Sequence, residues 1–180
     1  MKTTITLSAI LAALAFSACK ESATTATSEQ AIAPDPVLER FFTDEPIADA
    51  RQITAVRATV KPGDGITLTG LVMGRTKVFV DGRASFVLGD RTTLTPCSDM
   101  GEDDHCPTPW DACCDSKEDL LNGIASIQIV GEDGRVLSGN IKGTKGLKEL
   151  SKVTVTGTVA EQSTADSLIV NATKIHVGEP

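Results

Sequence analysis

Strand-like alternation dominates the chain beyond residue 64. In the segments 66–72 and 153–159, β-branched and other apolar residues alternate with polar or small ones, as expected when one face of a strand is buried. The two segments also echo each other, because Gly70 and Gly157 occupy the same place in them. A glycine inside a strand often marks a bulge or a sharp bend, and bent strands are needed to close a small barrel. The pattern therefore predicts a mainly β, closed architecture.

Strand patterning also covers four further segments: 78–88, 124–130, 135–141 and 167–177. The second and third of these predict a hairpin around the tight-turn pair Asp133-Gly134. Together the segments resemble the five-stranded OB-fold barrel, with the usual intervening helix reduced to a turn within 145–151. The local signs are Pro62-Gly63-Asp64 before the first strand and the repeated Thr-Gly pairs. We therefore expect an OB-like barrel domain over residues 63–178, with a β-sandwich as the competing architecture.

A single amphipathic helix is predicted ahead of the barrel. Between Pro46 and Val60, apolar residues recur at helical spacing: Ile47, Ala50, Ile53, Val56 and Val60. Pro46 suits a first helical turn, and the turn residues 61–64 supply a stop. We expect this N-terminal helical segment, residues 37–62, to pack over one opening of the barrel.

The first 18 residues have the composition of an export signal. Lys2 precedes an apolar run that is shorter than the about 20 residues needed to span a bilayer. Small residues then lead to Cys19, and this ending resembles the signal of bacterial lipoproteins, in which the cysteine after the cut is lipidated. The resemblance implies a signal peptide over 1–18, and a lipidated Cys19 with a flexible tether over 19–36. Because Lys20 rather than aspartate follows Cys19, we expect a cell-envelope location on the outer membrane, facing the periplasm.

The segment 94–120 reads as a long cysteine-rich insertion, with Cys97, Cys106, Cys113 and Cys114. In an oxidising compartment, four cysteines most economically form two disulfides. The adjacent pair would bridge each other only through a strained ring, so Cys97 and Cys106 should each pair with one of them. Two connectivities remain open, and each bridge would contribute about 2–4 kcal/mol. The string Cys-Pro-Thr-Pro-Trp-Asp-x-Cys-Cys resembles one in a poorly characterised family of exported OB-like proteins, which implies fold and location but no activity.

A metal site and a thiol-redox role are the alternatives to disulfides in the insertion. The leading interpretation has no metal and no cofactor. In the alternative, His105, Cys106, Cys113 and Cys114 hold zinc or copper, although adjacent cysteines do not readily share one tetrahedral ion. A thiol-redox role is disfavoured, because the many carboxylates nearby should raise the thiol pKa values. These carboxylates are expected to form a solvated acidic rim. Trp110 is expected to be buried and to provide a small core for the insertion; the alternative is that it contacts a ligand.

Charge and motifs exclude several classes of function. A net charge of −7, one tryptophan and no tyrosine argue against nucleic acid as a partner. The sequence contains no nucleophile elbow, metalloprotease motif or phosphate-binding glycine loop, so we expect no enzyme. His176 is expected to be a capping or exposed residue. A basic strip is expected to be a solvated turn: Lys142, Lys145, Lys148 and Lys152. We predict a lipid-anchored, non-catalytic periplasmic binding module with a disulfide-stapled loop, for an envelope protein or a small-molecule ligand; the alternative is a thiol-redox or metal-handling protein.

Overall fold

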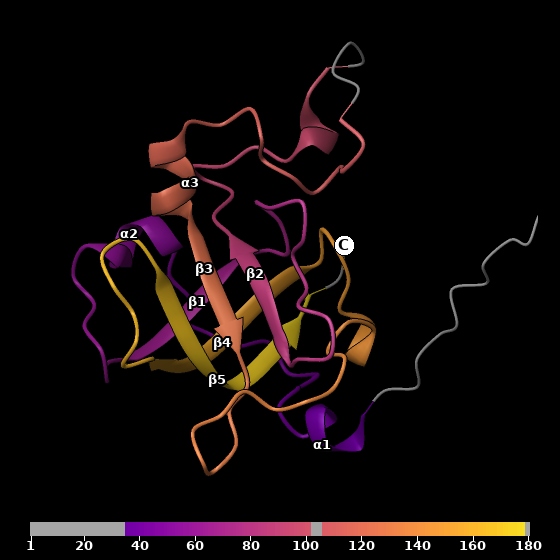
Figure 1. Cartoon of the computed structure of the whole chain (residues 1–180), viewed down its shortest axis with the longest axis vertical. Helices are drawn as coiled ribbons and strands as arrows, with labels where there is room; N and C mark the ends of the chain where they lie inside the picture. The colour runs from indigo at the N-terminus through magenta and orange to yellow at the C-terminus, as the bar shows by residue number, and fades with distance from the viewer. Residues whose placement is uncertain (1–34, 102–105, 179–180) are drawn as a thin grey trace, which may run out of the picture. The chain divides into compact units, whose positions relative to one another are not determined.

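Five strands close into a barrel in the computed structural model, which describes residues 35–101 and 106–178 (Figure 1). The strands follow the order β1-β2-β3-β5-β4 around the barrel. Their bounds are β1 Gly65–Leu71, β2 Ser85–Gly89, β3 Ile124–Gln128, β4 Lys152–Val159 and β5 Leu168–Val177. The predicted mainly β, five-stranded OB-like barrel is therefore confirmed. The signal peptide, Cys19 and most of the predicted tether lie outside the described residues.

The strand register explains how the barrel closes. β4 pairs antiparallel with β1 on one side and with β5 on the other. β2 pairs antiparallel with β3, and the parallel pairing of β3 with β5 joins the two halves. β1 and β2 meet only at Leu71 and Gly89, so the barrel is thin at this seam.

The predicted alternation places one face of each strand in the core. Buried and half-buried positions alternate strictly through β1 after Gly65 and through β4 after Lys152. The largest fully buried side chains combine strand residues with residues from connecting segments: Phe86, Leu38, Ile53, Leu68, Met73, Leu88, Leu94, Ile127, Ile129, Ile141, Leu147 and Ile175. The connections therefore supply about as much of the core as the strands do.

The two echoed glycines allow close backbone contacts. Between Thr156 and Gly157 the pairing of β4 with β5 shifts register, so a bulge lies at Gly157 with its extra residue, Thr173, on β5. The pairing of β1 with β4 is regular through Gly70. A Cβ atom on Gly157 would overlap the carbonyl oxygen of Asn171, and one on Gly70 would overlap the carbonyl oxygen of Gly89. Both positions therefore need a residue without a side chain. At Gly70 the close approach lies at the seam between β1 and β2.

The predicted helix over 46–60 is wrong in extent. The structure has a short α1, Pro36–Glu39, and a short α2, Ile53–Arg57. Between them the backbone bonds to sheet edges instead of to itself: Thr43 N–H donates to Ile175, and Arg51 exchanges two hydrogen bonds with β1. This intervening segment fills edges that the strands leave unpaired, which competes with helix formation. Ile53 and Val56 of the predicted apolar stripe still reach the barrel core, as does Leu38 of α1. However, α1 and α2 lie at opposite ends of the barrel in Figure 1, so the segment does not pack over a single opening as predicted.

Two more local predictions need correction, and one helix was not predicted. The segment 78–88 is itself a tight hairpin, with Phe79 bridged to Phe86, so only its second arm is β2. The segment 135–141 forms isolated bridges rather than a strand, one of them between Val130 and Val136. The helix α3, Lys117–Gly123, was not predicted; Ser116 caps it by accepting from the backbone N–H of Asp119 at 3.0 Å. The reduced helix before β4 is confirmed as the single turn Thr144–Gly146.

Asp90, directly after β2, fixes α2 to the barrel. Its fully buried carboxylate accepts hydrogen bonds from the backbone N–H and the hydroxyl of Thr54, in the first turn of α2. It also accepts from the backbone N–H of Thr92 at 2.8 Å and from the Thr92 hydroxyl at 2.6 Å. Burial opposes ionisation, but these hydrogen bonds outweigh it and lower the pKa of Asp90.

None of the described helices has the length and apolar character of a membrane span.

Candidate functional site

The cysteine insertion is held on one end of the barrel by a small core of its own. Met73, Leu94, Ala112 and Ile124 are buried together there, apart from the main barrel core. Trp110 is partly buried and packs against both cores, which agrees with its predicted core role. Figure 1 shows the insertion at the same end of the barrel as α2 and α3. The described residues of the insertion therefore form a fixed surface rather than a free loop.

The insertion has two arms, residues 94–101 and residues 106–116. Hydrogen bonds fix these arms to each other and to the barrel. The N–H of Cys97 donates to the Asp111 carbonyl at 2.8 Å, which joins the first arm to the second. The N–H of Gly74 donates to the Trp110 carbonyl at 2.9 Å, and the indole Nε1 donates to the Thr76 carbonyl at 3.1 Å. These contacts set the positions of the cysteines that flank them.

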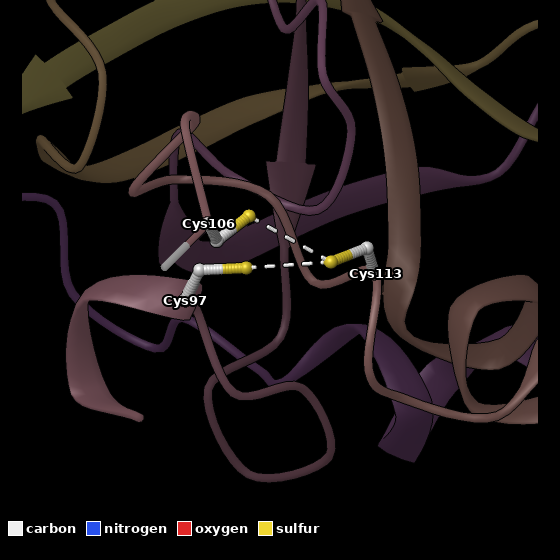
Figure 2. Close-up of side chains that lie close together, drawn as sticks. All are labelled: Cys97, Cys106 and Cys113. Atoms are coloured by element: carbon white, nitrogen blue, oxygen red, sulfur yellow. Dashed lines mark hydrogen bonds between the residues drawn. The ribbon is translucent and has the colours of Figure 1, made fainter. Parts of the chain in front are cut away.

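Three cysteine sulfur atoms converge between the two arms (Figure 2). The Sγ atom of Cys113 lies 3.5 Å from that of Cys97 and 3.7 Å from that of Cys106. All three sulfur atoms lie within 4.8 Å of one another. Cys97 is buried, Cys106 is half-buried and Cys113 is exposed, so the cluster extends from the insertion's core to its surface.

The sulfur cluster perturbs its own ionisation. Burial raises the pKa of the Cys97 thiol, whereas hydrogen bonding with Cys97 and then Thr108 lowers the pKa of Cys106. Hydrogen bonding with Cys97, Cys106 and Cys114 raises the pKa of Cys113 to about 12. The sequence predicted raised thiol pKa values caused by carboxylates. The pKa of Cys106 is lowered instead, and for Cys97 and Cys113 the pKa is raised by burial and by neighbouring thiols. Cys106 is the thiol that ionises most readily of these three.

The predicted disulfides are not formed in this structure. All four cysteines of the insertion are free thiols, and no pair of them lies at the bonding distance of about 2.0 Å. Both predicted connectivities require Cys114 to pair with Cys97 or Cys106. The sulfur contact that the described residues give Cys114 is instead with its neighbour Cys113, at 4.0 Å. Cys113 is instead close to both Cys97 and Cys106, whereas each predicted scheme pairs it with only one of them.

The ligand set of the metal alternative also changes. Cys106 and Cys113 belong to the cluster as proposed, but Cys114 does not share the common 4.8 Å distance, and His105 lies outside the described residues. Cys97, which the metal hypothesis left out, is the third member. Cys97 lies 16 residues before Cys113 in the sequence, so close spacing does not group them; the pairing of the two arms brings them together.

The carboxylates of the insertion are not simply a solvated rim. Asp111 is buried and accepts from the Thr76 hydroxyl at 2.7 Å. Asp115 accepts from the backbone N–H of Thr95 at 2.8 Å. Asp99 forms an ion pair with Arg91 at 2.6 Å, and its hydrogen bond with Arg91 lowers the pKa of Asp99. These described carboxylates therefore stabilise the fold of the insertion itself.

Two lysines of the basic strip and His176 have structural partners. In the basic strip, Lys142 pairs with Glu149 at 2.8 Å and Lys145 pairs with Asp44 at 3.3 Å. His176 lies with its Nδ1 atom 3.1 Å from the Thr43 carbonyl oxygen, beside the segment that covers the edge of β5. These contacts agree with the expected structural roles. The cysteine cluster is therefore the strongest candidate site among residues 35–101 and 106–178.

Comparison with known proteins finds no matching family model, no similar curated protein and no similar solved structure. Function must therefore be argued from the residues of the chain.

Proposed function

We propose that this chain is an exported, lipid-anchored protein of the bacterial cell envelope. In this proposal Cys19 carries the lipid, residues after it form a tether, and the barrel is a non-catalytic scaffold on the outer membrane facing the periplasm. The insertion 94–120 is the binding surface that the scaffold presents. The short apolar leader that ends at Cys19 supports the anchor.

One observation carries the binding role. The insertion is docked by its own small core and by the indole of Trp110, yet it leaves Cys113 and Cys114 exposed beside a half-buried Cys106. A long segment fixed in this way holds thiol side chains at set positions on the surface, which is how loops on a rigid scaffold bind ligands. Structural bracing alone does not require exposed thiols.

The anchor is tested with the full chain carrying Cys19→Ser, expressed in a bacterium that processes lipoproteins. We expect wild-type protein in the detergent-extracted membrane fraction and the variant in the soluble envelope fraction or retained with an uncut leader. Cys114→Ser is the matched control, and it should fractionate like wild type. Soluble wild-type protein, or wild-type protein in the cytosol, would contradict the proposal.

A disulfide-braced insertion is the second candidate, in which the cysteines only stabilise the fold. The 3.5 Å contact between the sulfur atoms of Cys97 and Cys113 favours it, because a small rotation of the two side chains could bring them into bonding range. Oxidising conditions after export would favour such a bond. In this candidate, Cys106 and Cys114 form the second bridge.

A further inference from the structure

We propose that Cys97, Cys106 and Cys113 form a three-thiolate site for one d10 metal ion of soft or borderline character, Zn(II) or Cu(I). This rests on the proposed function, because it names the ligand of the binding surface that the insertion presents. The convergence of the three sulfur atoms in Figure 2 carries the inference.

The spacing of the sulfur atoms fits shared coordination. With a metal–sulfur bond of about 2.3 Å, two thiolates on one tetrahedral ion lie about 3.8 Å apart, and two on a trigonal ion lie about 4.0 Å apart. The observed separations from Cys113 are 3.5 and 3.7 Å, and all three atoms fall within 4.8 Å. Shifts of a few tenths of an ångström would place each sulfur atom at bonding distance from one central ion.

The backbone positions two of the three ligands, Cys97 and Cys113, before any ion binds. Cys97 begins the single turn Cys97–Asp99, and its N–H is held by the Asp111 carbonyl. Cys113 follows Ala112, which is buried in the insertion's core. In Figure 2, Cys106 faces Cys113 from the same side as Cys97, and its sulfur lies 3.6 Å from the Thr108 carbonyl oxygen. Because the backbone already fixes two of the three ligands, little ordering is required when the metal binds.

Donor chemistry selects the class of ion. Thiolate ligands favour zinc and Cu(I) over magnesium or calcium, which prefer oxygen. Each thiol must lose its proton to bind, so up to three protons pass to solvent and three metal–sulfur bonds form, without any oxidation or reduction. Among the described residues, no fourth cysteine, histidine or carboxylate shares the common distance. The site therefore suits a trigonal Cu(I) ion, or a zinc ion whose fourth ligand is water or part of a binding partner.

Cys114 provides a matched control, because it is the neighbour of a proposed ligand and is exposed like Cys113. Its sulfur contacts that of Cys113 at 4.0 Å but is outside the cluster of three. If the metal bound nonspecifically to exposed thiols, replacement of Cys113 and replacement of Cys114 would weaken binding equally. The proposed geometry instead predicts that Cys113 matters and Cys114 does not.

The test uses the full mature chain, reduced and kept free of oxygen, in separate titrations with Zn(II) and Cu(I). Co(II) serves as the spectroscopic substitute for zinc. We expect one ion per chain in at least one of the two titrations. If zinc binds, the Co(II) form should show thiolate-to-Co(II) charge-transfer absorption. Cys97→Ser, Cys106→Ser and Cys113→Ser should each weaken binding by about 100-fold or more, since loss of even a ligand's supporting partner weakens sites by 10–100-fold. Cys114→Ser should change affinity by less than about threefold.

Circular dichroism and thermal unfolding of each variant confirm that the barrel is intact. Exposed Cys113 and half-buried Cys106 keep the test valid if replacement of buried Cys97 unfolds the insertion. No stoichiometric binding of either ion, or an equal loss in Cys114→Ser and Cys113→Ser, would overturn the metal site. Neither result would alter the membrane fractionation of the wild-type protein, which tests the proposed function independently.

Discussion

Gly70→Ala is expected to destabilise the barrel by about 3 kcal/mol or more, because added atoms in a closely packed site force the backbone apart. The new methyl group would overlap the carbonyl oxygen of Gly89 and would lie 3.0 Å from Cγ of Leu88. Strands β1 and β2 meet only at this end of the sheet, so their separation would open the seam. Chemical denaturation followed by circular dichroism measures the loss of unfolding free energy.

Gly65→Ala, in the same strand, is the control for this effect. A Cβ atom on Gly65 has no neighbouring atom within 4 Å, and the residue is exposed at the start of β1. Its replacement should change the free energy of unfolding by no more than about 0.5 kcal/mol. Equal losses in the two variants would show that strand glycines matter here through backbone flexibility, and not through the close approach of β1 to β2.

Asp90→Ala is expected to reduce stability by about 3 kcal/mol, because it removes a buried carboxylate and leaves its donors without partners. Those donors include the backbone N–H groups of half-buried Thr54 and exposed Thr92, at 2.9 and 2.8 Å from the carboxylate. Loss of Asp90 also releases the first turn of α2 from the end of β2. Asp81→Ala, at an exposed position in the turn of the 78–88 hairpin, should have little effect.

The same carboxylate makes stability depend on pH. Hydrogen bonds lower the pKa of Asp90 in the folded protein, so its contribution is fully present above the unfolded value of about 4. The contribution is lost as the pH falls through the folded pKa. Asp90→Asn removes this ionisation while it keeps the shape of the side chain. Its unfolding free energy should therefore fall less steeply than that of wild type between about pH 4 and pH 2, and parallel curves would contradict the assignment.

The barrel could be predicted because its signals are local. Alternation through β1 and β4 follows directly from the period of two, and Gly157 marks the bulge at the point where the register shifts. The helix prediction failed because helical spacing in 46–60 says nothing about competing sheet edges. Arg51 uses its backbone to extend the pairing of β1, and this competition depends on residues distant in the sequence.

The candidate site could be predicted only in part. The four cysteines were identified from their spacing and from the expected compartment, but their grouping depends on how the two arms of the insertion dock. That docking relies on Met73 and Leu94, which come from separate connections and carry no periodic signal. Cys97 joins Cys113 only because the Asp111 carbonyl fixes the first arm beside the second. The grouping of three sulfur atoms is therefore a tertiary property.

The most direct test of the three-sulfur site is a combined count of metal and thiols in protein isolated from the cell envelope without added reductant. Elemental analysis gives the metal content, and thiol titration after denaturation with a chelator gives the number of free cysteines. A metal-bound cluster predicts about one zinc or copper ion per chain, with the cysteines of the cluster recovered as free thiols. Protein with no bound metal and no free thiol in residues 94–120 would contradict it and would establish the disulfide-braced insertion instead.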